Sequence, residues 1–594
     1  MFKNSRKLLV LILSLILAVS MIGCSNTKDT SGEAGIYKPG TYVGIGKGHN
    51  GDVKVEVKFD ADKITAVKVL DNEETENIAS TPIERIPEEI VNGQTLNVDT
   101  VTGATYTSNA ILEAVEDAVI QAGGDVESLK ASTGKEEGEI VEKEMTTDVV
   151  VIGAGGTGLA AAASAHENGA QVIVLEKLPM TGGSTALSGG SISAPGSRFQ
   201  KELGIEDSKE AWLELWRQRQ ASETESKYPN YDKVDKFIDE AVVTTHWLND
   251  YIGLEFESVD GFGFDPVKRL HTPKNGGTGI TTSIDEFIGK EGIEVLTETP
   301  ATELITDESG NIVGVIAAGP KGEKITINAK KVILASGGFA KNEELLARLI
   351  PEMKGTSELS AASAGSTGDG ILMAEGVGAA LYDENWIIGL GYTSLIPELR
   401  MLDWDSTKIL VNEKGNRFMN ESSHYAIVTN TVANEELAWM MVDSSEMNAK
   451  ATEAIKSKMP NDEIISGDTI EELASAMGVD PSTLTNTINS FNDGVKTGKD
   501  EFDKPESMLV SVEKGPFYAF KVYPRTMGTF GGVKTDDKFR VLREDGSIIN
   551  NLYAGGECTN KPLYNRVYMT GSSVQFALTS GRIAGEDAAK SIEK

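Results

Sequence analysis

The feature that most constrains this chain is a glycine-rich turn between an apolar strand and a helix of small residues. Residues 148–152 (DVVVI) have the pattern of a buried strand and run directly into GAGGTG, which the small-residue stretch LAAAASAHENG follows. In that arrangement Gly153 permits the tight turn, Gly155 lets the backbone approach a pyrophosphate, and Gly158 allows close helix packing. The pattern therefore predicts a Rossmann-like dinucleotide site, with Ala154 beside these glycines at the cofactor.

A second strand and an acidic residue follow in the order that a dinucleotide site requires. Residues 171–175 (QVIVL) form another apolar run, which ends at Glu176, with Lys177 directly after it. A carboxylate at the end of the second strand of such a unit accepts hydrogen bonds from the cofactor's ribose. We therefore place Glu176 and Lys177 at the cofactor. A second fingerprint of this kind does not occur, so NAD(P)H is not expected to bind.

Length and composition narrow the class of protein further. A chain of 594 residues exceeds one ordinary domain and indicates several. Its 90 acidic and 56 basic residues give a net charge of −34, which repels nucleic acid and anionic membrane surfaces. Two cysteines, Cys24 and Cys558, and five histidines are too few for zinc clusters, iron–sulfur ligation or a disulfide framework. We expect no metal site and no nucleic-acid partner.

The N-terminal residues have the pattern of an export signal. Basic residues precede an apolar run over residues 8–22, which is shorter than a membrane-spanning helix needs. The run ends in MIGCS, which resembles the lipobox of bacterial lipoproteins, where the cysteine receives the lipid. The resemblance implies that residues 1–23 are removed and that Cys24 anchors an exported protein to the outer face of the cell membrane by lipid alone. A cleaved signal with an incidental cysteine is the alternative. Residues 24–35 are polar, as a tether requires.

A second motif lies upstream of the glycine turn, in a smaller unit. Residues 40–70 alternate apolar and polar side chains as half-buried antiparallel strands do, and DTVTGAT at 99–105 leads into a helix that Gly123 and Gly124 end. DTVTGAT resembles the attachment motif of FMN-binding domains, in which a flavin transferase joins the FMN phosphate to the last threonine. The resemblance implies covalent FMN on Thr105, where the helix N-terminus favours the phosphate charge. An ordinary strand–turn–helix junction is the alternative.

The stretch after the second strand indicates which dinucleotide the larger unit binds. Residues 180–190 (MTGGSTALSGG) resemble the Gly-Gly-Asn/Ser-Thr segment of FAD enzymes in the fumarate reductase and flavocytochrome c family, and shorter matches continue to the C-terminus. The resemblance implies non-covalent FAD. Beyond the residues named above, it places at the FAD Gly182, Gly183, Ser184, Thr185, Gly189, Gly190, Ala301, Asp369, Glu557, Ser573 and Val574.

Together with these resemblances, the segments imply a multidomain protein of α/β and α+β architecture. A small α+β FMN-binding domain precedes a Rossmann-like FAD-binding domain, into which an α+β capping domain is inserted. The expected bounds are 1–23 for the signal, 24–35 for the tether, 36–126 for the FMN-binding domain, 127–146 for the linker, 147–385 and 525–594 for the FAD-binding domain, and 386–524 for the capping domain.

The expected substrate site departs from the family pattern. In dicarboxylate-reducing relatives, an arginine that acts as the acid lies four residues after the Asn-Glu of a Gly-x-Arg-Phe-x-Asn-Glu motif. Here GNRFMNE is followed by Ser-Ser and then by His424 and Tyr425, so that Tyr425 takes the place of the arginine. The histidine and arginine that clamp carboxylates in those relatives also lack counterparts. We therefore expect dicarboxylates to be poor substrates, because a buried carboxylate needs cationic partners. Tyr425 is the expected proton donor, with His424 or Arg400 lowering the cost of its phenolate.

Aromatic residues near these motifs suggest a pocket for a larger, less charged acceptor. The residues expected to line it are Trp386, Tyr392, Trp404, Tyr564 and Tyr568, with Arg566 as a candidate carboxylate ligand. The alternatives are that Tyr425 only lines the pocket, that His424 is a surface or capping residue, and that Arg566 is a surface cation.

The expected function is an extracytoplasmic reductase of the C=C bond of an α,β-unsaturated carbonyl compound. Electrons would pass from a quinol- or flavin-linked membrane donor through FMN to FAD. Three alternatives stay open: a urocanate- or acrylate-type enoate reductase, a dehydrogenase of a steroid-like ketone working in the reverse direction, and an electron-transfer lipoprotein without catalysis of its own.

Overall fold

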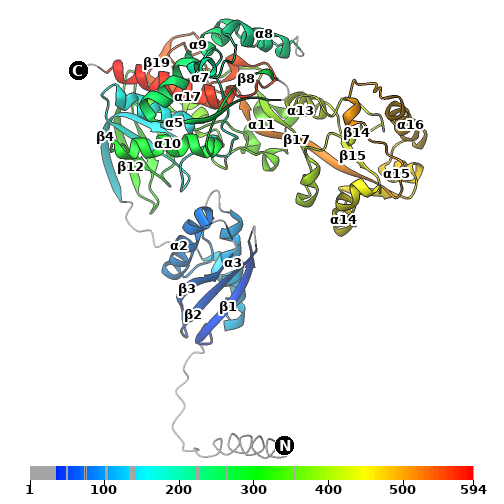
Figure 1. The fold of residues 1–594 in the computed structure, drawn as a ribbon. Coiled ribbons are helices and arrows are strands. Elements are labelled where there is room, and N and C mark those ends of the chain that lie inside the picture. The colour runs from blue at the N-terminus through cyan, green and yellow to red at the C-terminus, as the bar shows by residue number, and fades with distance from the viewer. Residues whose placement is uncertain are drawn as a thin grey trace, which may run out of the picture. The chain divides into compact units, whose positions relative to one another are not determined.

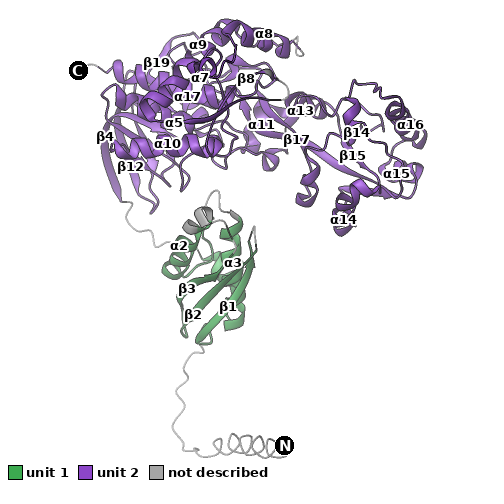
Figure 2. Ribbon diagram, in the orientation of Figure 1, with its two compact units in different colours: residues 1–136 green, residues 137–594 purple. Residues whose placement is uncertain are grey.

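The computed structural model of the protein forms two compact units, residues 1–136 and 137–594 (Figure 2). It describes residues 35–48, 51–72, 74, 76–98, 100, 105–132, 141–221, 226–262, 265–353 and 355–592. The expected signal, Cys24 and nearly all of the expected tether lie outside the described residues, as does most of DTVTGAT. Among the helices that are described, none has the length and apolar character needed to cross a membrane.

The first unit is a three-stranded antiparallel sheet covered by helices. Its strands, in spatial order, are β1 (Gly40–Lys47), β2 (Asp52–Phe59) and β3 (Ile64–Asp71) (Figure 1). Alternation along β2 buries Val53, Val55 and Val57 against the helices. The helices are α2 (Glu76–Gly93), α3 (Thr105–Ala122) and α4 (Val126–Ala131).

Two glycines of β1 bring α3 close to the sheet. A Cβ atom added at Gly44 would lie 1.8 Å from the carbonyl oxygen of Ala114, and one at Gly46 would lie 1.9 Å from that of Ala110. Only glycine therefore permits this backbone contact. The close packing fixes the position of α3, whose first residue is Thr105.

The interval expected as a linker, residues 127–146, includes parts of a helix and a strand. It begins inside α4, which the Asp125 carboxylate caps by accepting the N–H groups of Glu127 and Ser128. It ends inside β4, because residues from Glu142 onward pair in parallel with β12. Charged composition alone did not reveal either element.

The second unit is built on an eight-stranded, largely parallel sheet. Parallel pairing joins β4 to β5 and β12, β5 to β9, and β12 to β19, while β10 with β11, β11 with β12 and β18 with β19 pair antiparallel. This is the Rossmann-like arrangement expected from the glycine-rich turn. Its strands are β4 (Glu142–Ile152), β5 (Val172–Leu175), β9 (Glu294–Leu296), β10 (Ala301–Thr306), β11 (Ile312–Ala318), β12 (Lys324–Leu334), β18 (Arg540–Leu542) and β19 (Ile548–Ala554).

Two helices distant in sequence pack against each other beside this sheet. The helix after the glycine turn, α5 (Gly156–Glu167), lies along the C-terminal helix α17 (Ser572–Lys590) (Figure 1). A Cβ atom at Gly581 or Gly585 of α17 would come within 2.2 or 2.3 Å of a carbonyl oxygen of α5. Small residues on both helices therefore allow the contact, and it brings the two ends of the second unit's sequence together.

Further helices and a small sheet surround this framework. Antiparallel pairing joins β8 to β6 and β7. These elements are β6 (Ile192–Ser193), β7 (Phe256–Phe262), β8 (Asp265–Pro273), α6 (Gly183–Ala186), α7 (Arg198–Glu202), α8 (Lys209–Gln220), α9 (Tyr231–Trp247), α10 (Gly276–Lys290), α11 (Glu343–Leu349) and α12 (Asp369–Gly376).

The region expected as the capping domain has its own sheet, covered by helices on both faces. One long strand, β17, pairs with β15 and β16 in its first half and with β13 in its second half (Figure 1). Separate apolar clusters lie on the two faces of this sheet. The elements are β13 (Trp386–Thr393), β14 (Ile409–Asn412), β15 (Ala438–Val442), β16 (Ile464–Gly467), β17 (Phe517–Phe530), α13 (Tyr425–Ala433), α14 (Ala449–Lys458), α15 (Ile470–Met477) and α16 (Pro481–Thr497).

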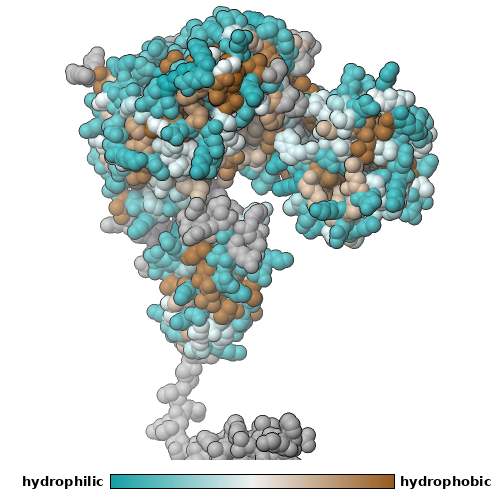
Figure 3. Space-filling model, in the orientation of Figure 1, coloured by the Kyte–Doolittle hydropathy of each residue, from teal (hydrophilic) through white to brown (hydrophobic). Residues whose placement is uncertain are grey.

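Hydrophilic residues spread over the face drawn in Figure 3, and hydrophobic residues form separate patches between them. With a net charge of −34, this surface favours solubility and opposes binding of polyanions.

Candidate active site

A cavity of about 470 Å³ lies in the second unit, where the strands β4, β5 and β12 end. The carboxyl ends of parallel strands are where such sheets bind dinucleotides. Most residues expected at the FAD line this cavity: Gly153, Gly155, Glu176, Lys177, Gly183, Ser184, Thr185, Gly189, Gly190, Ala301, Asp369, Glu557, Ser573 and Val574.

Three residues expected at the FAD shape the turn behind the cavity and do not line it. A Cβ atom at Gly158 would lie 1.8 Å from the carbonyl oxygen of Gly153, so Gly158 permits the helix to start against the turn. Ala154 donates its N–H to Glu176, and its own carbonyl oxygen accepts the N–H of Gly182 at 2.8 Å. Their role is to hold the backbone that other residues present to the cavity.

The cavity has the backbone openings that a pyrophosphate requires. A Cβ atom added at Gly189 would have no heavy atom within 4 Å, and one at Gly155 would first meet another glycine at 3.9 Å. Side chains at these positions would fill the cavity, whereas glycine leaves N–H groups accessible near the N-terminus of α5. The residues present therefore fit a dinucleotide such as FAD.

Glu176 is held in place by backbone donors. Its two carboxylate oxygens accept the N–H groups of Ala154 and Leu178, each at 2.8 Å. Burial raises the pKa of Glu176, while these two N–H groups act in the opposite direction. Beside it, Lys177 pairs with Asp369, with 2.6 Å between Nζ and Oδ2. The acid and the cation predicted from sequence thus lie together at one end of the cavity.

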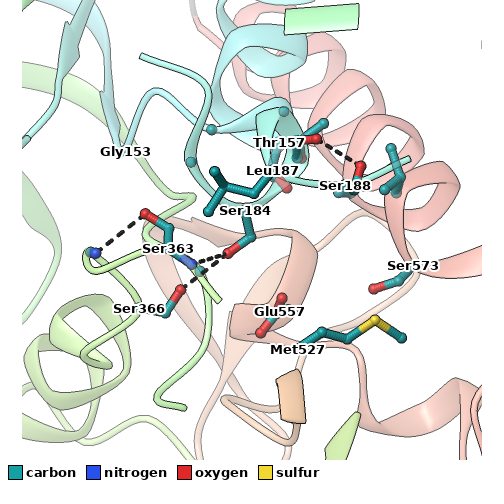
Figure 4. Close-up of a pocket in the computed structure, with 18 of the residues that line it drawn as sticks. Gly153, Thr157, Ser184, Leu187, Ser188, Ser363, Ser366, Met527, Glu557 and Ser573 are labelled. Carbon is teal, nitrogen blue, oxygen red and sulfur yellow. Dashed lines mark hydrogen bonds between the residues drawn. The ribbon is translucent and has the colours of Figure 1, made fainter. Parts of the chain in front are cut away.

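A serine cluster crosses the middle of the cavity (Figure 4). The Ser184 hydroxyl oxygen accepts the backbone N–H of Ser363 at 3.0 Å and lies 3.3 Å from the Ser366 hydroxyl. Ser363 was missed by sequence reasoning, because its segment reaches Ser184 only through the tertiary fold. These hydroxyls offer donors and acceptors to a bound cofactor.

Glu557 lies beneath the end of β17. Its carboxylate accepts the N–H of Thr529 at 3.0 Å, and a Cβ atom at Gly528 would come within 2.7 Å of it. Figure 4 places Glu557 beside Met527, which also lines the cavity. Burial raises the pKa of Glu557 to about 7. The carboxyl group can therefore exchange a proton near neutral pH.

A buried ionic network positions the start of α13. Arg417 pairs with Glu421 at 2.8 Å, and Lys504 approaches the same carboxylate at 3.1 Å. Glu421 also accepts the N–H of Leu410 in β14 at 3.0 Å. The GNRFMNE motif is thus a structural clamp, and the helix that begins four residues after Glu421 carries Tyr425 into the cavity.

Tyr425 lines the cavity among other aromatic rings. The centroid of its ring lies 6.4 Å from those of Phe262 and Trp404 and 6.0 Å from that of Tyr568. Its hydroxyl is 3.1 Å from that of Thr570. Burial raises the pKa of Tyr425, and Thr570 and the positive charge of Arg219 act in the opposite direction.

The cation near Tyr425 is Arg219, which corrects the expectation for His424 and Arg400. Burial lowers the pKa of His424 to about 3, so its ring is neutral at physiological pH. Arg400 is exposed on the short helix Pro397–Leu402, where it donates to the carbonyl oxygen of Ser394 at 3.2 Å, and it does not line the cavity. Arg219 lies at the end of α8, and no sequence motif connects it with Tyr425.

Several of the expected pocket residues belong to the core instead. Tyr392 packs in the capping core, and Tyr564 stacks on Phe530 at 4.3 Å. Their side chains face inward because β13 and the segment before α17 are covered on that side. Trp386 is likewise buried, and the guanidinium of Arg566 stacks on its ring at 3.9 Å. These aromatic residues, and Arg566 with them, do not line the cavity, whereas Trp404 and Tyr568 do.

The described residues hold no group of three or more His, Cys, Asp and Glu side chains placed to bind a metal ion. The chemistry that the geometry can support is that of a dinucleotide at one end of the cavity and a tyrosine hydroxyl at the other. Such a fold and site define a flavoprotein with a separate small N-terminal unit.

Comparison with known proteins identifies the family. A family model described as FAD binding domain matches residues 148–573, and one described as FMN-binding domain matches residues 48–120. The chain belongs to the FAD-binding fumarate reductase and urocanate reductase family and carries an N-terminal FMN-binding domain. The fold class expected from sequence is confirmed.

Three similar proteins illustrate the range of this family. A urocanate reductase of Eggerthella lenta is 32% identical, with 96% of each chain covered. An NADH:acrylate oxidoreductase of Vibrio harveyi is also 32% identical, over 93% of this chain, which spans only 61% of that relative's length. The open conformation of a flavocytochrome c3 fumarate reductase superimposes with a TM-score of 0.59 at 28% identity, covering 75% of this chain and 78% of that one.

Proposed function

We propose that this protein is a flavin-dependent reductase of a C=C bond conjugated to a carbonyl or carboxyl group. The observation that carries the proposal is Tyr425, whose hydroxyl lies in the same cavity as the glycine-rich FAD cradle. FAD, when bound and reduced, supplies a hydride for one alkene carbon. The chain must then supply a proton to the other carbon, and Tyr425 is the residue positioned for it.

The acceptor class is proposed from the side chains around Tyr425. Phe262, Trp404 and Tyr568 offer apolar, aromatic surface to a planar unsaturated molecule. Arg219 contributes the nearby positive charge, which a monocarboxylate would match. Enoates with an aromatic or heteroaromatic substituent therefore fit best. A fumarate reductase is among the similar proteins, so C4-dicarboxylates remain in the class to be tested.

We also propose how the electrons arrive. FMN joined covalently to Thr105 would relay electrons from a quinol- or flavin-linked membrane donor to FAD, and a flavin transferase would make the attachment. The DTVTGAT motif and the FMN-binding domain match support this role. Export and a lipid anchor on Cys24, which the lipobox-like MIGCS supports, would place the protein on the outer face of the membrane.

An acceptor screen with the flavin-loaded protein tests the function. The protein is reduced with dithionite, and flavin reoxidation is followed after mixing with acrylate, urocanate, cinnamate, fumarate, a cyclic enone or a soluble ferric chelate. We expect rapid reoxidation by one enoate, with the saturated acid as product. Reoxidation by the ferric chelate alone would instead identify an electron-transfer protein and overturn the proposal.

Tyr425→Phe tests the proton donor. We expect turnover to fall by about 100-fold or more while FAD content is unchanged, because the variant loses only the hydroxyl. Tyr523→Phe is the matched control, since its hydroxyl contacts Glu463 in the capping sheet and not the cavity. An unchanged turnover in Tyr425→Phe would remove this residue from the reaction.

A further inference from the structure

The Thr570 hydroxyl contacts both Tyr425, the first residue of α13, and His424, which caps that helix. The oxygen of this hydroxyl lies 3.1 Å from the Tyr425 hydroxyl and 3.4 Å from Nε2 of His424. Thr570 also lines the cavity. We propose that His424 and Thr570 are positioning residues that fix the direction of the Tyr425 O–H bond, so that the phenol proton is presented to the acceptor. This inference rests on the proposed function, and it gives a role to Thr570, which the sequence motifs did not suggest.

The tautomer of His424 follows from its place at the N-terminus of α13. Its Nδ1 accepts the backbone N–H of Ala426 at 3.3 Å and so caps the helix. The ring is buried and neutral, and it therefore carries one hydrogen, which we assign to Nε2. Nε2–H then donates to the hydroxyl oxygen of Thr570. Because Nδ1 caps the helix, the hydrogen of His424 is on Nε2 and faces Thr570.

The backbone of Thr570 is fixed independently of its side chain. Its carbonyl oxygen accepts the hydroxyl of Ser193 at 3.2 Å, and the N–H of Ser193 donates to the carbonyl oxygen of Gly571 at 3.0 Å. A Cβ atom at Gly571, which has φ of +77°, would come within 2.4 Å of the Ser193 hydroxyl. The short strand β6 therefore holds the backbone from which the Thr570 side chain approaches Tyr425.

The bond between Thr570 and Tyr425 can run in two directions. If Tyr425 donates, its proton is committed to Thr570. If Thr570 donates, the Tyr425 oxygen is the acceptor, and the phenol hydrogen is directed to an acceptor other than Thr570. We infer the second direction, because His424 already donates to Thr570 and a tyrosine that loses its proton in a buried site needs a donor.

In the proposed step, Tyr425 transfers its phenol proton to the acceptor. The O–H bond of Tyr425 breaks, its hydrogen bonds to the alkene carbon that did not receive the hydride, and the electron pair stays on the phenolate oxygen. Thr570 continues to donate to that oxygen, so no hydrogen bond has to be rearranged during the step. Preorganised donors of this kind act mainly on the transition state.

Three substitutions separate this role from a purely structural one. Thr570→Val removes the hydroxyl at constant shape, and Thr570→Ser retains it. His424→Asn keeps a side chain that can cap α13 but cannot reach Thr570 with a donor. Thr431→Val is the matched control, because Thr431 is on the same helix and its hydroxyl donates to the backbone carbonyl oxygen of Ile427 at 2.8 Å.

The experiment measures kcat and KM with the enoate found in the acceptor screen, and FAD content for each variant. We expect kcat to fall about 10-fold or more in Thr570→Val and His424→Asn, with KM within about threefold of the parent, and most of the rate to return in Thr570→Ser. Thr431→Val should resemble the parent.

The outcomes distinguish this inference from the proposed function. If Tyr425→Phe is inactive but Thr570→Val keeps the parental kcat, the positioning role is overturned and the proton donor stands. A change in KM alone, or loss of FAD with no rescue in Thr570→Ser, would also overturn it, since the threonine would then serve binding or folding. Full activity in Tyr425→Phe would overturn the proposed donor itself.

Discussion

The Glu176 carboxylate accepts the backbone N–H of Ala154 at 2.8 Å, which ties the end of β5 to the glycine-rich turn after β4. Besides the contact with a ribose expected from sequence, Glu176 therefore has a structural role in holding the turn. Its other oxygen accepts the N–H of Leu178 at 2.8 Å, so the carboxylate is held rigidly between two backbone segments. The cofactor turn and the acid act as one unit.

Replacing Glu176 should therefore weaken FAD binding more than the loss of one cofactor contact. We expect Glu176→Ala to lower FAD affinity by about 100-fold, because both backbone N–H groups lose their acceptor in a buried site. Titration of apoprotein with FAD, followed by flavin fluorescence, measures the change. Glu294→Gln, on the exposed side of neighbouring β9, is the control. Equal affinities for the two variants would contradict the prediction.

Thr105→Val should abolish covalent flavin on the first unit. The substitution removes the only atom of this residue that can bond to phosphorus, and valine keeps its shape at the start of α3. We expect no flavin fluorescence in a denaturing gel after co-expression with a flavin transferase. Thr65→Val on β3 is the control, because its hydroxyl donates to the carbonyl oxygen of Lys58 in the neighbouring strand β2 at 3.0 Å. A fluorescent Thr105→Val band would place the attachment elsewhere.

Arg219→Gln should slow the proposed proton transfer. The positive charge of Arg219 lowers the pKa of Tyr425 against the effect of burial, so its removal raises that pKa further and disfavours the phenolate. We expect about a 10-fold slower reoxidation of reduced flavin by the enoate in a single turnover, and a smaller loss in Arg219→Lys. Arg217→Gln on the same helix serves as the control, since this residue stacks on Tyr231. Identical rates for Arg219→Gln and Arg217→Gln would refute the electrostatic role.

Acid should destabilise the second unit through His271. This ring is buried, lies 2.7 Å from the Ser197 hydroxyl, and has its pKa lowered to about 4 by burial. Between about pH 6.5, the ordinary value, and pH 4 the unfolded chain binds a proton that the folded chain does not. The contribution of His271 to the free energy of unfolding should therefore be largest above pH 6.5. Below that pH it should fall by about 1.4 kcal/mol per pH unit. In urea unfolding, His271→Asn should be less stable at pH 7.5 but show the shallower pH dependence. Parallel profiles would contradict this assignment.

The cofactor half of the site was predictable from sequence because its demands are local. A turn that needs glycine at Gly153 and a strand that ends in Glu176 leave a pattern in consecutive residues, and the structure brings them to one cavity. The acceptor half was not, because it is assembled from distant segments. Gln220, the last residue of α8, is hydrogen-bonded to Asn565 and Val567, just before Tyr568. These bonds hold the end of α8, and with it the charge of Arg219, near Tyr425.

The position of an aromatic residue near a motif predicted the cavity lining less well than the motif itself. Tyr392 and Tyr568 look alike in sequence, yet the first is packed in the capping core and the second lines the cavity. Which side of a strand is covered depends on elements elsewhere in the chain, here the helices on each face of the capping sheet. Composition and spacing carry no information about that choice.

The long strand β17 has a mechanical consequence for the cavity. Its first residues are paired into the capping sheet through β15 and β16, and its end places Thr529 against the Glu557 carboxylate. Between these two ends the pairing of β17 with β13 is irregular around Gly389. The capping sheet and the surroundings of Glu557 therefore share one continuous strand, so that a shift of the sheet would also shift the backbone donor of the Glu557 carboxylate.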